Sequence, residues 1–107
     1  SDWQRLETES IAKTDVVCTA SGGRMITVKK HEETLVAEGP VTLSRDSLIC
    51  GDMEIPLSKI SDMSIHGRRG LVFTAQKQYY ELVPSRDANA LKFLWLYEEY
   101  TKQNANT

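Results

Sequence analysis

The sequence predicts a mainly β domain: an antiparallel barrel or sandwich of about seven strands, capped by one C-terminal α-helix. Short apolar segments with alternating polar neighbours recur at roughly the 8–12-residue spacing that is typical of sandwiches and barrels. After Pro84 the apolar period becomes helical, and residues 87–102 are predicted to form the closing helix. Strands do not alternate with helices, so a parallel sheet is not expected.

The predicted strands follow one another with clear turn signals between them. They cover residues 15–20, 25–30, 34–38, 53–57, 60–65, 71–74 and 79–83, with 41–43 and 47–50 as either a strand pair or one long bent strand. Glycines predict turns at 21–24, 39–40 and 51–52, and polar residues predict turns at 31–33 and 76–78. Pro56 predicts that its strand lies at a sheet edge or is bulged, because proline cannot donate to a ladder.

The first residues of the chain differ from the rest in composition. Residues 1–13 are polar and acidic, and they are predicted to be either a linker or a short helix capped by Asp2, before one domain at 14–107. The chain begins at Ser1 without a methionine, which fits a domain cut from a longer protein. No stretch reaches the ~18 consecutive apolar residues of a spanning helix, and no signal peptide is visible.

Charge and cysteine content narrow the function classes. The formal net charge is −2 with both signs interspersed, which argues against a nucleic-acid binder because such domains carry a clearly basic face. Cys18 and Cys50 lie in apolar strand segments, so buried thiols are favoured over a disulfide. Without a CxxC or HxxxH spacing, no metal site is predicted.

The closing helix has more apolar surface than a helix covering a barrel requires. Such a helix needs an apolar stripe a little over 100° wide, and this one is apolar around much more than half its circumference. We expect Phe93, Leu96 and Tyr100 to pack on another domain, a second copy or the segment around Trp3. The alternative is that these aromatic side chains lie along the barrel rim and bury only their ring bodies.

The order of strands followed by a tryptophan-bearing helix resembles the pleckstrin-homology superfold and its bacterial relatives. The segments that carry the resemblance are residues 39–46, 55–65, 66–74, 79–82 and 90–97. In these domains a strand often ends in a proline-leucine step before an isoleucine docks, as Pro56, Leu57 and Ile60 would do here. The resemblance implies a pleckstrin-homology-like barrel at about residues 14–102.

A narrower resemblance covers residues 44–97. This part is similar to the accessory domain that follows the catalytic domain in some bacterial 1-acyl-glycerol-3-phosphate (lysophosphatidate) acyltransferases. Those enzymes use a histidine separated by four residues from an aspartate, but His31 is followed at that distance by Val36, and His66 by Leu71. The resemblance therefore implies that the chemistry belongs to an upstream catalytic domain, and that this chain is its accessory part.

Basic turns are the candidate binding sites. The His66, Arg68 and Arg69 tip, bracketed by glycines, offers guanidinium donors to phosphate or carboxylate. Phosphoinositide-binding pleckstrin-homology domains use basic residues around their first hairpin. Here the resemblance assigns that hairpin to residues 21–24, with Arg24 and the nearby Lys29 and Lys30. The alternative for all these residues is a charged surface turn without a specific ligand.

No catalytic motif is found. The serines lack a GxSxG elbow, the glycines form neither a Walker loop nor a GxGxxG fingerprint, and both histidines fall in predicted turns. We therefore expect a non-catalytic accessory or regulatory module without a cofactor. Its expected location is cytoplasmic, peripheral to the inner face of the membrane, with an upstream catalytic domain, a protein or an anionic membrane surface as partner. The alternatives are a free-standing interaction module that dimerises through the helix, and a ligand-binding barrel or enzyme with an unrecognised cavity.

Overall fold

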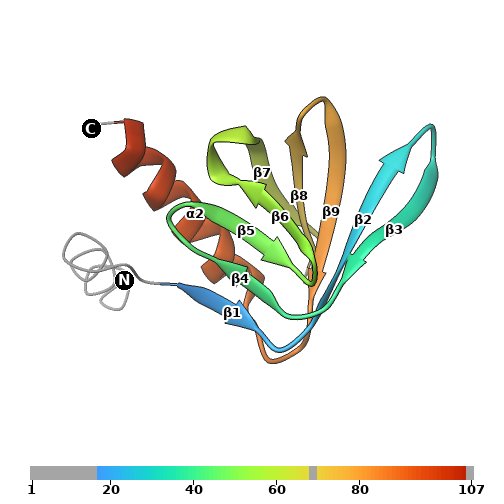
Figure 1. The fold of residues 1–107 in the computed structure, drawn as a ribbon, viewed down its shortest axis with the longest axis horizontal. Helices are drawn as coiled ribbons and strands as arrows, with labels where there is room; N and C mark the ends of the chain where they lie inside the picture. The colour runs from blue at the N-terminus through green and yellow to red at the C-terminus, as the bar shows by residue number, and fades with distance from the viewer. Residues whose placement is uncertain (1–16, 68–69, 106–107) are drawn as a thin grey trace.

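The computed structural model describes residues 17–67 and 70–105, and these form nine antiparallel strands and one long helix (Figure 1). The elements are β1 (Cys18–Ala20), β2 (Gly23–Lys29), β3 (Glu32–Glu38), β4 (Val41–Leu43), β5 (Ser47–Cys50), β6 (Met53–Pro56), the 3₁₀ turn η1 (Leu57–Lys59), β7 (Ile60–His66), β8 (Gly70–Ala75), β9 (Gln78–Pro84) and α2 (Ala90–Ala105). The prediction of a mainly β fold closed by a C-terminal helix is confirmed.

The strands form two sheets. One has four strands in the order β1-β4-β5-β6, and the other has five in the order β3-β2-β9-β8-β7. Helix α2 contacts β1 and β4 of the first sheet and β7 and β8 of the second. In Figure 1 it lies on the side of the molecule away from the β2–β3 hairpin, which projects beyond the rest of its sheet. The helix therefore leaves the β2–β3 edge of the five-stranded sheet uncovered.

One apolar core joins the two sheets and the helix. Met25, Phe73 and Leu82 of the five-stranded sheet and Val41 and Leu43 of the four-stranded sheet are fully buried in it. The Phe73 ring stacks on Tyr80 of the neighbouring strand, with the ring centroids 5.4 Å apart. Alternate residues along the strands supply these side chains, as the period of two in the sequence requires.

The strand count differs from the prediction at two places. Segments 41–43 and 47–50 are separate strands, β4 and β5, which resolves the alternative of a single bent strand. The residues that precede Gly23 form the short strand β1, which pairs with β4 rather than with β2. Residues 21–24 are therefore not the first hairpin, and that prediction is wrong. The chain crosses there from one sheet to the other, and the first hairpin is β2–β3.

Two smaller predictions from the sequence are confirmed. Strand β6, which ends at Pro56, lies at the edge of the four-stranded sheet. Cys18 and Cys50 are both described and both are buried thiols. The Cys50 sulfur donates to the Gly23 carbonyl at 3.8 Å, and burial raises the pKa of the Cys50 thiol.

Helix α2 begins three residues later than predicted because Asp87 has another role. The Asp87 carboxylate accepts a hydrogen bond from the Ser21 backbone N–H at 3.1 Å and another from the Ser85 hydroxyl, and these bonds lower its pKa. Asn89 caps the helix instead, since its side-chain oxygen accepts from the Leu91 N–H at 3.0 Å. Asp87 thus ties the approach to α2 to the connection between the two sheets.

The helix surface is not arranged as predicted. Phe93, Leu96 and Tyr100 are 2%, 0% and 0% exposed and belong to the core. Their spacing of three and four residues places them on one helix face, and that is the face turned to the sheets. They form no accessible interaction face, which corrects the prediction. Trp3, the fourth residue assigned to that face, lies outside the described residues. The exposed apolar residue of α2 is Leu91, at 64%.

Candidate anion-binding end of the five-stranded sheet

The predicted binding residues fall at two opposite ends of the five-stranded sheet. Thr27 of β2 pairs with Tyr80 of β9, so Lys29 and the first residues of β9 lie at one end. Arg24 pairs with Val83 at the other end, where the β7–β8 hairpin also turns after His66. Arg68 and Arg69 lie outside the described residues. The predicted residues therefore do not form one site.

The β2–β3 turn presents Lys30 and His31 at the Lys29 end of the sheet. Lys29 pairs with Glu32, which leaves a two-residue loop. Both loop residues have positive φ, 51° and 68°, the pattern of a type I′ turn. Such turns favour asparagine and glycine, because the left-handed conformation costs other residues roughly 1–2 kcal/mol. Lysine and histidine therefore occupy this turn against local preference.

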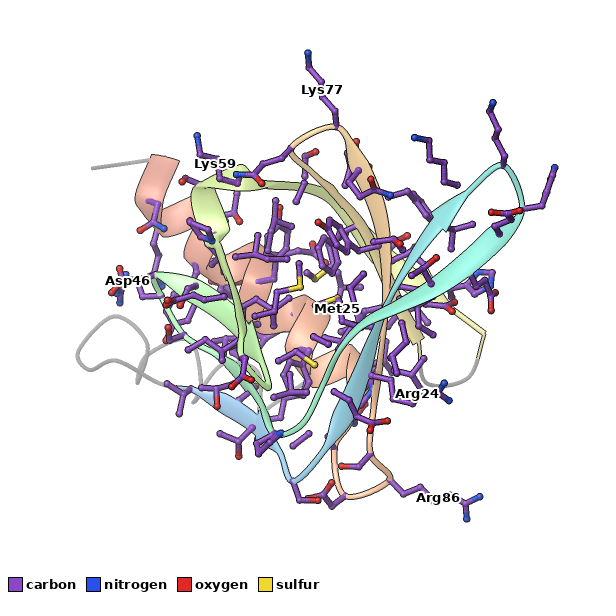
Figure 2. The ribbon with its side chains drawn as sticks, turned by 45° about the vertical axis from the view of Figure 1, so that its right-hand side comes forward. Arg24, Met25, Asp46, Lys59, Lys77 and Arg86 are labelled. Atoms are coloured by element: carbon purple, nitrogen blue, oxygen red, sulfur yellow. The ribbon has the colours of Figure 1, made fainter. Side chains whose placement is uncertain are left out.

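The neighbouring β8–β9 turn repeats this geometry. Ala75 pairs with Gln78, so the loop consists of Gln76 and Lys77, with φ values of 52° and 67°. Figure 2 shows Lys77 extended into solvent at one end of the molecule, with Arg86 at the opposite end. Two tight turns at one sheet end thus each carry a lysine at a position that favours glycine. Such strain in neighbouring turns is a recurrent feature of ligand-binding sites.

A recess of about 340 Å³ lies along the β2–β3 hairpin and reaches the first residue of β9. It is lined by Thr27, Lys29, Lys30, Glu32, Thr34 and Gln78. Ammonium groups, threonine hydroxyls and a glutamine amide can all donate hydrogen bonds to phosphate oxygens. Glu32 is the carboxylate among the lining residues, and it faces Lys29 across the strand pair. The recess is therefore rich in donors and open to solvent.

The opposite end of the sheet is more acidic than its arginines suggest. Arg24 lies 3.8 Å from the Glu38 carboxylate, with both side chains more than half exposed. His66 lies 3.7 Å from the Glu81 carboxylate. Arg24 and His66 thus each lie near a carboxylate of another strand, which reduces the charge that these two residues offer to an anion.

Sequence reasoning identified Lys29 and Lys30 but missed Lys77, Gln78, Thr27 and Thr34. The last two alternate with the lysines in one hairpin, so their shared face could have been read from the period of two. Lys77 and Gln78 join the site only through the pairing of β2 with β9, and no local pattern indicates that pairing. The proximity of the two turns is a property of the fold.

Within residues 17–67 and 70–104, no group of three His, Cys, Asp or Glu side chains could hold a metal ion. No described helix is long and apolar enough to cross a membrane.

Comparison with known proteins adds no assignment. The chain matches no protein-family model, no curated protein and no solved structure. The resemblance to pleckstrin-homology domains and to the acyltransferase accessory domain therefore stays a prediction.

Proposed function

We propose that this domain is a non-catalytic accessory module that seats a larger assembly on an anionic phospholipid surface. The observation that carries the proposal is the exposed lysine from each of two adjacent strained turns, Lys30 and Lys77, beside the recess that Lys29 lines. Following the resemblance of residues 44–97, we propose a phospholipid-synthesis acyltransferase as the assembly. The substrates of such an enzyme lie in the membrane, so a domain that holds it at the membrane surface would keep it close to them.

The expected affinity is modest. Each basic residue near an anionic surface contributes about 1 kcal/mol, so three lysines contribute at most about 3 kcal/mol, and Glu32 opposite Lys29 offsets part of it. That is too little to anchor a free domain firmly. A domain tied to a membrane enzyme gains from the high effective concentration of a linked site, so a weak contact can orient its catalytic partner. An accessory role therefore fits the number of lysines better than an anchoring role.

The experiment is co-sedimentation of the chain with vesicles of phosphatidylcholine alone or of phosphatidylcholine with phosphatidylglycerol. We expect binding to the anionic vesicles only, falling as salt rises because the attraction is screened. A parallel titration with inorganic phosphate, read by thermal unfolding, separates the two sources of phosphate. A rise in melting temperature without vesicle binding would show a soluble phosphate ligand and contradict membrane seating.

The dimerising module loses its basis in this chain. That alternative relied on Phe93, Leu96 and Tyr100, which are buried in the core. The ligand-binding barrel predicted a cavity between sheet and helix, and an open pocket of about 280 Å³ lies there, between β1 and the start of α2. That alternative therefore stays open beside the accessory module.

A further inference from the structure

Strand β3 is an exposed edge of the five-stranded sheet. It stands last in the strand order and pairs with β2 on one side, and no described strand pairs with its other side. All of its residues except Ala37 are exposed, including Leu35 at 47% and Val36 at 43%. Every second residue of an edge strand directs its N–H and C=O away from the sheet, which makes a template for another strand.

A groove lies at the Glu38 end of this edge, where the Gly51 backbone lies against that of Glu38, so residues 32–37 are the open part of the edge. It has a volume of about 390 Å³ and is lined by Val36, Ala37, Glu38, Asp52 and Met53. Three of these side chains are apolar and two are carboxylates. A strand added to β3 would place alternate side chains into this groove, so the lining favours apolar residues next to basic ones.

The side of β3 that pairs with β2 shows which charges a strand next to β3 carries. On that side Arg24 faces Glu38 and Lys29 faces Glu32, with the apolar residues Met25 and Ile26 between them. The open side of β3 also favours basic side chains. The Glu38 side chain stays 64% exposed beside Arg24, and Asp52 adds a further carboxylate. Opposite charges across a strand pair are stabilising, and like charges are destabilising.

A second copy of this chain, paired through β3 over its full length, would not supply the basic side chains that β3 favours in a partner strand. Full antiparallel overlap of two β3 strands would set Glu38 of one copy opposite Glu32 of the other; a shift of one residue would set it opposite Glu33 in one direction and His31 in the other, so the charges oppose full overlap rather than every register. The acidic ends of β3 thus act against full-length edge-to-edge pairing of identical chains.

We propose that β3 accepts an extended segment of a partner protein in which basic residues flank a short apolar run. The segment adds as a sixth strand, and its basic side chains contact Glu32, Glu38 and Asp52. Glu32 also lines the recess beside Lys29, so the two surfaces meet at that residue; Glu38 and Asp52 lie outside the recess, and variants of these two residues test the β3 edge separately from phospholipid binding.

The probe is a labelled synthetic peptide with the sequence of residues 22–30, which has the required pattern. The control peptide carries glutamate at its three basic positions. We expect saturable binding of the basic peptide to the full chain, with slowed amide hydrogen exchange at residues 33–37. The acidic peptide should bind at least about fivefold more weakly.

Two variants locate the binding. Leu35→Pro removes a backbone donor at the edge, and the double variant Glu38→Lys with Asp52→Lys reverses the charges without changing the backbone. Each should weaken binding by at least about fivefold, while Asp46→Lys, a charge reversal at a distant exposed turn, should leave it unchanged. Absence of saturable binding, or equal binding of the acidic peptide, would overturn the proposal. So would a concentration-dependent dimer that protects β3 without peptide, because the occupant would then be a second copy.

Discussion

Tyr97 combines burial with a hydrogen bond to the main chain in the core. It is 7% exposed, and its hydroxyl donates to the Ile60 carbonyl at 2.9 Å, joining α2 to the start of β7. Burial is the main cause that raises the pKa of Tyr97 above its ordinary value of 10.0, because an ionised phenolate there would be poorly solvated. The neutral hydroxyl is therefore part of what stabilises the helix on the sheets.

Replacing Tyr97→Phe should lower the free energy of unfolding by about 1–2 kcal/mol at pH 7, since the buried Ile60 carbonyl loses its donor. A raised folded-state pKa stabilises the protein fully below the unfolded-state value of 10.0 and is lost as pH rises through the folded-state value. The wild-type protein should therefore lose stability more steeply above pH 10 than the variant. Urea unfolding at neutral and alkaline pH measures both effects, and parallel pH profiles would contradict this role.

In the two hairpin turns, lysines at positive φ lower the stability of the fold but place charges where an anion could bind. Lys77 has a φ of 67°, so it occupies a position that glycine would occupy without strain. The stability lost through backbone strain at Lys77 is consistent with a lysine charge that serves binding.

Lys77→Gly should raise the free energy of unfolding by about 1 kcal/mol, because it relieves the left-handed strain. The same change should weaken binding to anionic vesicles, since one lysine is lost. Lys77→Ala is the matched control: it removes the charge but keeps a side chain at positive φ, so it should weaken binding without stabilising the fold. Unfolding curves and vesicle co-sedimentation separate the two effects. Unchanged vesicle binding in both variants would remove Lys77 from the site.

Helix α2 shows how far the sequence determines an element. Its existence and approximate range follow from the apolar period, but its orientation does not, because apolar residues surround most of its circumference. Phe93, Leu96 and Tyr100 share one face, and nothing local distinguishes a face turned to the sheets from one turned outward. The same holds for its first residue, since only the contact of Asp87 with Ser21 explains why the helix begins at Ala90.

The orientation of α2 predicts a sharp contrast between two of its residues. Phe93→Ala should destabilise the domain by about 3–5 kcal/mol, because it opens a cavity in the core. Leu91→Ala, on the exposed side, should change stability by less than about 0.5 kcal/mol. Thermal and urea unfolding of the two variants test this, and similar effects would mean that the helix faces the other way.

At the scale of the whole molecule, the pairing of β2 with β9 creates the candidate site. It joins a hairpin near the start of the chain to a turn near its end, and so brings Lys29 and Lys30 close to Lys77. It also places Arg24 at the far end of the sheet, with Glu38 beside it. The strand pattern predicts the presence of these turns but not their grouping, because strand order depends on long-range pairing.

Whether the lysine end of the sheet binds anionic phospholipid is tested by comparing the two ends of the sheet. Vesicles containing phosphatidylglycerol are titrated with the wild-type chain, with Lys29→Glu plus Lys30→Glu, and with Arg24→Glu plus Arg86→Glu, a matched pair of charge reversals at the opposite end. We expect the lysine variant to lose salt-sensitive binding, and the arginine variant to lose clearly less. Equal losses would reduce the interaction to net charge, and a selective loss in the arginine variant would place the binding surface at the wrong end of the sheet.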